Sequence, residues 1–324
     1  MTSSKAAPPS LLARVVFLAL AAATLHPAVT ASVGLIVGIA AALTFGNPYA
    51  KLTKKATATL LQLSVVALGF GMNLRVVLAA GLQGFAMTFA GIVGCFIVGA
   101  LLRVLLRVPR DVGLLLTVGT AICGGSAIAA VVPAIGANDD DATVSLAVVF
   151  LLNALGLVAF PFIGHALGLD EARFGLWAAL AIHDTSSVVG AASQYGKVAL
   201  EVATTVKLAR ALWIVPLALL IGWWRSRSRS AEAGPRPSVK KPWFIVGFLA
   251  AAAVVTFVPE VATAGALAAR VARQSLVLTL FLIGANLTRG ALRSVGARPL
   301  AMGLALWVVV AAATLAALRL GLIS

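Results

Sequence analysis

Long uncharged apolar runs constrain this chain more than any other feature of its sequence. Four runs contain no acidic residue, lysine or arginine, namely Gln83–Leu102, Val112–Ala137, Ala142–Leu169 and Pro299–Leu318. About 20 apolar residues are enough for a helix to cross the hydrocarbon core of a bilayer. Because 61% of the residues are hydrophobic and only 11% are charged, the composition excludes a soluble cytosolic enzyme. We therefore expect an all-α polytopic membrane protein.

The apolar segments are separated by short basic or turn-forming stretches. We expect helices over residues 11–25, 30–45, 57–79, 83–104, 111–136, 142–168, 173–194, 199–224, 242–258, 262–289 and 298–319. The first segment imitates a signal peptide, but Arg14 interrupts its apolar region and we expect it to be retained. Residues 1–324 then form a single membrane unit with about ten or eleven transmembrane helices.

The basic residues are distributed unevenly between the two ends of these helices. With a cytoplasmic N-terminus, 18 lysine and arginine residues fall on the cytoplasmic side and five on the other side. This asymmetry follows the positive-inside rule and predicts a multi-pass protein of the inner (plasma) membrane. The net charge of +15 then needs no nucleic acid, and residues 225–241 are interpreted as a basic cytoplasmic linker beside anionic lipid.

Two internal similarities indicate how the helices are related. Gly71-x-Asn73-Leu74 recurs as Gly284-x-Asn286-Leu287, in segments predicted to run in opposite directions. Inverted repeats of this kind place substrate and coupling ions at broken helices. Asn73 and Asn286 are candidate ion-coupling residues, with an interhelical hydrogen bond as the alternative. A second match relates Ala121-Ile122-x-x-x-Ser126 to Ala181-Ile182-x-x-x-Ser186. These two segments are predicted to run parallel, not inverted. Three explanations stay open: a miscounted helix, a re-entrant segment, or a chance match.

Asp184 alone among the ten acidic residues has apolar sequence on both sides. An intramembrane carboxylate is by default a functional hypothesis, here exchange of a proton or binding of a cation such as sodium. His183 is its neighbour, and both line one cavity only if the helix breaks there. Thr185, Ser186 and Ser187 would cap a restarting helix. A structural ion pair for Asp184 and a satisfied buried histidine are the alternatives.

Gly124, Gly125 and Ser126 interrupt another apolar segment. The glycines permit unwinding, and the exposed N–H groups of the following half-helix would bind an anion. Close helix packing through small residues is the alternative. Lys207 and Arg210 are three residues apart inside a further span and need compensation, from Asp184 or from a bound anion. The alternative interpretation is that both side chains snorkel to the outer surface of the membrane.

Sites for other chemistry are not found. Cys95 and Cys123 both lie within predicted spans, so a structural disulfide is not expected. The chain has no haem, zinc or iron–sulfur spacing and no phosphate-binding loop, so we expect no cofactor and no ATP-driven transport. An intramembrane enzyme could use His183 and Asp184 with a serine, but no nucleophile motif supports it and we expect no enzymatic activity.

Three phrases carry a family resemblance. Gly119–Ala130, Ala181–Val189 and Val206–Arg210 together resemble the YeiH-type sulfate exporter family over nearly the whole chain. That family looks related to the bile-acid/sodium symporters and the cation/proton antiporters. The resemblance implies a panel and a core domain with crossed, discontinuous helices, and it places Gly124, Gly125 and Ser126 at one crossing.

These observations predict a secondary transporter, with export as the expected direction, of a small anion such as sulfate or a related sulfur oxyanion. The substrate-binding candidates are Gly124, Gly125, Ser126, Thr185, Ser186, Lys207 and Arg210, and the ion-coupling candidates are His183, Asp184, Asn73 and Asn286. Expected partners are the anion, a proton or sodium ion and the lipid bilayer, with a homodimer left open. The alternatives are an organic anion transporter of the bile-acid symporter type and a channel.

Overall fold

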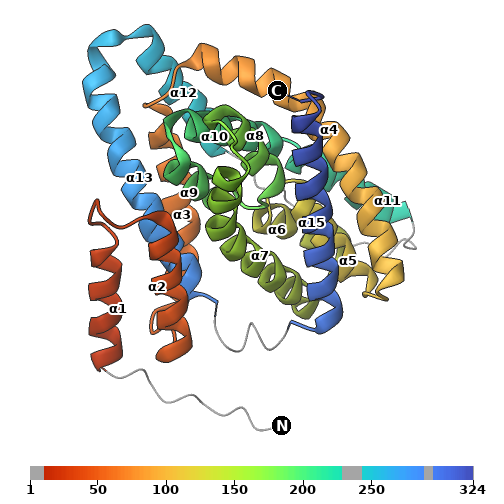
Figure 1. Cartoon of the computed structure of the whole chain (residues 1–324). Coiled ribbons are helices and arrows are strands. Elements are labelled where there is room, and N and C mark those ends of the chain that lie inside the picture. The colour runs from red at the N-terminus through yellow and green to blue at the C-terminus, as the bar shows by residue number, and fades with distance from the viewer. Residues whose placement is uncertain (1–10, 228–242, 288–294, 324) are drawn as a thin grey trace.

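The chain is built from helices. The computed structural model describes residues 11–227, 243–287 and 295–323, and within these ranges all regular secondary structure is helical (Figure 1). From residue 228 on, the predicted cytoplasmic linker lies outside the described residues. The helices are α1 (Leu11–Ala23), α2 (Ala31–Thr44), α3 (Ala50–Gly69), α4 (Leu74–Leu105), α5 (Arg110–Ala121), α6 (Gly125–Ile135), α7 (Asp139–Ala166), α8 (Glu171–Ala181), α9 (Thr185–Tyr195), α10 (Lys197–Ala211), α11 (Ile214–Arg227), α12 (Trp243–Phe257), α13 (Ala262–Ala285) and α15 (Ala297–Arg319).

Several of these helices match the dimensions of a bilayer. Five helical stretches are long and apolar enough to cross a membrane, namely Thr88–Leu105, Asp139–Ala166, Lys197–Arg225, Pro259–Ala285 and Ala297–Arg319. Shorter apolar helices, among them α1, α2, α6 and α12, accompany them. The exposed surface carries many large hydrophobic side chains, as expected where lipid is the solvent. The prediction of an all-α polytopic membrane protein is confirmed.

One predicted helix boundary is wrong. The sequence predicts helices over 57–79 and 83–104, whereas α3 ends at Gly69 and α4 runs without interruption from Leu74 to Leu105. The chain turns at Asn73, whose side-chain oxygen accepts a hydrogen bond from the Arg75 N–H at 2.9 Å. The Leu74 N–H donates to the Thr256 hydroxyl at 2.9 Å. Both bonds satisfy first-turn donors of α4, so the cap at Asn73 decides where the helix begins.

The helices form two packed groups. The first consists of α1, α2, α3, α12 and α13, and the second of α4 to α11 with α15 (Figure 1). Small residues let the helices of the first group approach closely, as in many membrane proteins. A Cβ atom at Gly38 of α2 would lie 2.1 Å from the Phe281 carbonyl oxygen of α13, and one at Gly284 would lie 2.4 Å from the Leu35 carbonyl oxygen.

Helix α9 joins the two groups. A Cβ atom at its Gly190 would lie 2.9 Å from Leu280 Cδ1 of α13 and 3.1 Å from Ala31 Cβ of α2. The Ser32 hydroxyl of α2 also donates to the side-chain oxygen of Gln194 at 3.0 Å. A shift of one group against the other would therefore act directly on α9.

Candidate functional site

Three of the predicted spans in the second group are discontinuous, and one of them, 199–224, folds as α10 and α11 with Leu212 and Trp213 between them. The other two spans approach each other at their breaks. Residues 111–136 fold as α5 and α6, with Ile122–Gly124 between them, and residues 173–194 fold as α8 and α9, with Ile182–Asp184 between them. The predicted discontinuous helices are thus confirmed. We call these two linkers the paired breaks, because a Cβ atom at Gly124 would lie 3.4 Å from both Cα and Cβ of Asp184.

Gly124 makes the first break sterically possible. Its φ of 64° and ψ of −127° lie in a region that side chains with a Cβ rarely adopt. A Cβ atom there would also lie 3.2 Å from Val149 Cγ1. At Gly125, the next residue, a Cβ atom would lie 3.0 Å from the Phe150 ring. The glycine pair therefore allows the helix to unwind here and lets the backbone of the first break lie close to α7.

Hydrogen bonds of Asp184 stabilise the second break. Its carboxylate Oδ2 accepts hydrogen bonds from the Ser186 N–H at 3.1 Å, from the Ser187 N–H at 3.4 Å and from the Ser186 hydroxyl. The N-cap of α9 is therefore Asp184 itself, so the expectation that the following residues Thr185–Ser187 cap this helix is wrong. The Asp184 N–H donates to Asn153 Oδ1 at 3.1 Å, which ties the break to α7.

The side chain of Lys207 in α10 caps the carboxyl end of α8. Its Nζ donates to the Ile182 carbonyl at 2.7 Å and to the Ala179 carbonyl at 3.3 Å. The side chain is fully buried, so it does not snorkel to the surface. A cation is favourable here because the last carbonyls of a helix lack intrahelical partners and carry its negative end.

Arg210 connects the carboxyl ends of both broken helices. On the α5 side, Nε and Nη2 donate to the Ala121 carbonyl at 3.1 and 2.6 Å, and Nη2 donates to the Thr120 carbonyl at 3.1 Å. On the α8 side, Nη1 donates to the Ala179 carbonyl at 3.2 Å and to the Leu180 carbonyl. Arg210 as a whole is 3% exposed, which also excludes snorkelling. The planar guanidinium carries five N–H donors, so it can form hydrogen bonds with carbonyl groups of both helices at once.

The charges around the paired breaks do not balance. With Lys207, Arg210 and Asp184 ionised, the cations exceed the carboxylate by one unit charge. Among the residues that the structure describes, neither cation forms an ion pair with a carboxylate. The two carboxyl ends and the two amino ends of the half-helices carry partial charges of about −0.5 and +0.5 each, which cancel. If all three side chains are ionised, one positive charge is left inside the bundle, and an anion would compensate it.

Unpartnered polar atoms gather near the second break. Both ring nitrogens of His183, Nδ2 of Asn153 and Oγ1 of Thr204 are buried and have no hydrogen-bond partner in the described part of the chain. The His183 ring lies edge-on to Trp307, with 6.3 Å between the centroids. Because buried polar groups are normally satisfied, such atoms indicate a place where a ligand or water binds.

The amino end of α6 offers further donors. Gly125 and Ser126 are its first residues, and among the described residues their N–H groups and the Ser126 hydroxyl have no hydrogen-bond partner. Ser126 is exposed, whereas Gly125 is buried. By contrast, the amino end of α9 is occupied by Asp184. The donors of α6 are therefore the ones left open for an anion.

Asn73 and Asn286 do not join this cluster. Asn286 Oδ1 accepts hydrogen bonds from Thr53 Oγ1 and Asn47 Nδ2, each at 3.0 Å. Asn73 caps α4 and lines a small cavity with Ala262 and Ala266 of α13. Within the described ranges, neither amide forms a hydrogen bond with a residue of the paired breaks. The two asparagines lie at opposite ends of the antiparallel pair α3 and α13, as an inverted repeat predicts, and their role in ion coupling stays a prediction.

Sequence reasoning missed one donor at this site. The Trp307 indole of α15 donates to the Ala181 carbonyl at 3.0 Å, so a third side chain closes the carboxyl end of α8. The only signal was a tryptophan in the middle of an apolar run, where its N–H must find a partner. No group of three histidine, cysteine, aspartate or glutamate side chains suited to a metal occurs among the described residues.

Comparisons with known proteins agree on one family. The family model of conserved hypothetical protein 698 matches residues 10–303, which include both breaks and α10. A UPF0324 membrane protein of Bdellovibrio bacteriovorus is 52% identical over 310 residues, 96% of this chain and 95% of the relative. UPF0324 membrane proteins of Bacteroides thetaiotaomicron and Geobacter sulfurreducens are 46% and 44% identical, over 89% and 95% of this chain and 86% and 97% of their own lengths. No solved structure matches.

Proposed function

The chain belongs to the conserved hypothetical protein 698 family, and we propose that it is a secondary transporter of a small anion across the inner membrane. The observation that carries this proposal is the grouping of two buried basic side chains, Lys207 and Arg210, with the one buried carboxylate of Asp184 at the paired breaks. Broken helices that meet inside a membrane bundle are the usual binding sites of secondary transporters. An anion there would use half-helix donors and would remove the excess charge.

The division of the helices into two groups supports transport rather than static binding. Alternating access is commonly a rocking of one bundle against another around a fixed site. Here α9, which begins at the second break, packs through Gly190 against α2 and α13 of the other group. Movement between the groups would therefore change access to the paired breaks.

The donors favour an oxyanion. The open N–H groups of Gly125 and Ser126 and the Ser126 hydroxyl would bind substrate oxygens, while Gly124 holds the break in shape. Sulfate or a related sulfur oxyanion is our candidate substrate, and export its direction, because of the resemblance to the YeiH-type sulfate exporters. Lys207 and Arg210 would act mainly through their charge, since their hydrogen bonds already go to backbone carbonyls.

Asp184 and His183 provide a means of coupling. A proton or sodium ion on the Asp184 carboxylate would neutralise it and increase the positive excess that holds the anion. The affinity for the cation and the affinity for the anion would then rise together, as linkage requires. The two ions would move in the same direction, so export would be driven by an outward gradient of the anion or of the cation. The unpartnered nitrogens of His183 lie next in sequence and would take part in proton transfer.

Flux measurements in proteoliposomes test this proposal. We expect saturable movement of labelled sulfate or sulfite that depends on the protein and responds to an imposed proton or sodium gradient. Preferred movement of small carboxylates would instead support an organic anion transporter. Flux that neither saturates nor responds to a counter-ion would identify a channel and refute secondary transport.

A further inference from the structure

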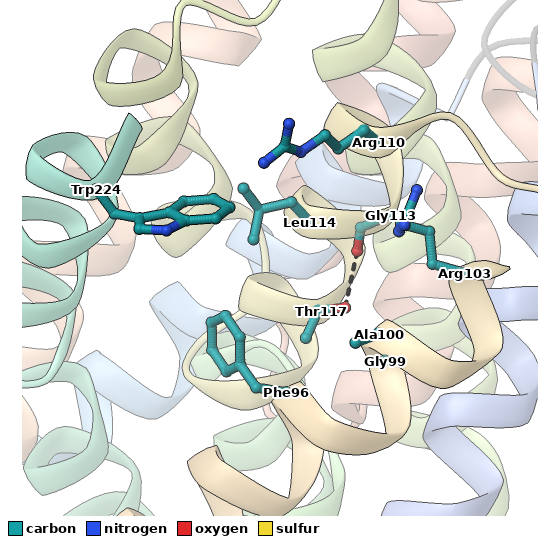
Figure 2. Close-up of a pocket in the computed structure, with 9 residues that line it drawn as sticks. All are labelled: Phe96, Gly99, Ala100, Arg103, Arg110, Gly113, Leu114, Thr117 and Trp224. Carbon is teal, nitrogen blue, oxygen red and sulfur yellow. Dashed lines mark hydrogen bonds between the residues drawn. The ribbon is translucent and has the colours of Figure 1, made fainter. Parts of the chain in front are cut away.

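A cavity lies apart from the paired breaks, between α4, α5 and α11. It encloses about 410 Å³ and is lined by Phe96, Gly99, Ala100, Arg103, Arg110, Gly113, Leu114, Thr117 and Trp224 (Figure 2). None of these residues belongs to either break. The distribution of basic residues predicts that this end of the bundle is cytoplasmic, because the turn between α4 and α5 adds Arg107 to the two lining arginines.

Within the described ranges, no carboxylate neutralises the two lining arginines. Arg103 lies in the last turn of α4 and packs on α5, since a Cβ atom at Gly113 would lie 2.6 Å from Arg103 Cγ. Arg110 begins α5, and its guanidinium carbon lies 5.0 Å from the centroid of the Trp224 ring. The nearby carboxylate of Asp111 is already paired with Arg225 at 3.0 Å. Among the described residues, Arg103 and Arg110 therefore form no ion pair.

The remaining wall of the cavity is apolar and faces lipid. Figure 2 shows Arg110 beside Leu114 and Trp224, Arg103 on the other side of Gly113, and Phe96 farther along the cavity. On the outer surface beside it, Ile97 and Leu101 of α4 are 65% and 66% exposed. Such exposed apolar side chains contact acyl chains in a membrane protein. The cavity thus combines positive charge at the predicted cytoplasmic end with an apolar wall that continues into the bilayer.

We propose that this cavity binds the phosphate-bearing head of an anionic phospholipid, with an acyl chain along the exposed face of α4. Guanidinium groups bind phosphate oxygens through charge-assisted, often bidentate hydrogen bonds. Basic pockets between membrane helices on the cytoplasmic side favour anionic head groups, and tryptophan suits the level of the head groups. A free inorganic anion would use the charges but would leave the apolar wall without a ligand.

Lipid binding to the purified full chain tests the site. Native mass spectrometry would measure apparent dissociation constants for phosphatidylglycerol and phosphatidylcholine. We expect tighter binding of phosphatidylglycerol, and a loss of about fivefold for each arginine removed in Arg103→Gln/Arg110→Gln. The matched control Arg298→Gln, an exposed residue of the same predicted side outside the cavity, should keep the wild-type constants.

Three results would overturn the proposal. Equal affinity for the two lipids, or an equal loss in Arg298→Gln, would show attraction to the surface charge in general. Displacement of phosphatidylglycerol by millimolar inorganic phosphate or sulfate would identify a free-anion site. Melting without lipid checks that the variants fold, and the single change at the exposed Arg110 carries the test if the double variant does not fold.

Discussion

Replacement of Arg210 should destabilise the empty protein strongly. The buried guanidinium donates to four backbone carbonyls at the carboxyl ends of α5 and α8. Loss of one partner from a buried charged network costs about 3–5 kcal/mol. We therefore expect Arg210→Gln to lower the free energy of unfolding by this amount. Arg210→Lys keeps the charge but loses the planar fork, and should cost about half as much.

Thermal melting in detergent measures this effect. Each kcal/mol corresponds to about 2–4 °C for domains of about 150–250 residues, so the melting temperature of Arg210→Gln should fall by about 6–20 °C. All variants need the same scan rate, because membrane proteins often unfold irreversibly. Arg173→Gln is the matched control, since it breaks only an exposed pair with Asp170 and should cost about 0–1 kcal/mol. Unchanged melting of Arg210→Gln would refute the role of Arg210 in holding the two half-helices.

Further predictions concern the backbone, the anion donors and the topology. Gly124→Ala should cost about 1–3 kcal/mol from its backbone conformation, with φ 64° and ψ −127°, and more from its contacts. Gly168→Ala, with φ 66° and no atom within 4 Å, should show a backbone cost alone, and an equal or larger melting shift in Gly168→Ala would contradict this. A Ser126→Cys variant should react with thiol reagents more slowly when sulfate is present, and unchanged labelling would exclude an anion at α6. Cysteine accessibility should find Asn138–Asp141 outside and Arg225–Lys241 in the cytoplasm, and the opposite pattern would overturn the orientation.

The positions of the paired breaks could be predicted from the sequence, because the local chemistry conflicts with a continuous apolar helix. Two adjacent glycines at Gly124 and Gly125 permit unwinding, and a carboxylate at Asp184 needs donors that only a broken helix supplies. The need of Lys207 and Arg210 for compensation could also be predicted.

The partners of these residues depend on packing and could not be predicted. Arg210 meets the carbonyls of α5 and α8 only because α10 packs beside both, and Trp307 reaches Ala181 from the far end of the chain. The start of α4 depends on both kinds of contact, because Asn73 caps the helix locally and Thr256 of α12 accepts a hydrogen bond from its first N–H group. Local patterns indicate where a backbone group needs a partner, but tertiary structure decides which residue supplies it.

Gradient-driven accumulation of labelled sulfate in proteoliposomes, measured for wild type and Asp184→Asn, tests the central claim most directly. Asparagine is a good N-cap, so the variant should fold and insert while losing the charge that couples the two ions. We predict that the wild type concentrates sulfate under a proton or sodium gradient, that Asp140→Asn at an exposed position does the same, and that Asp184→Asn does not. Accumulation by Asp184→Asn at the wild-type level would contradict coupled anion transport at the paired breaks.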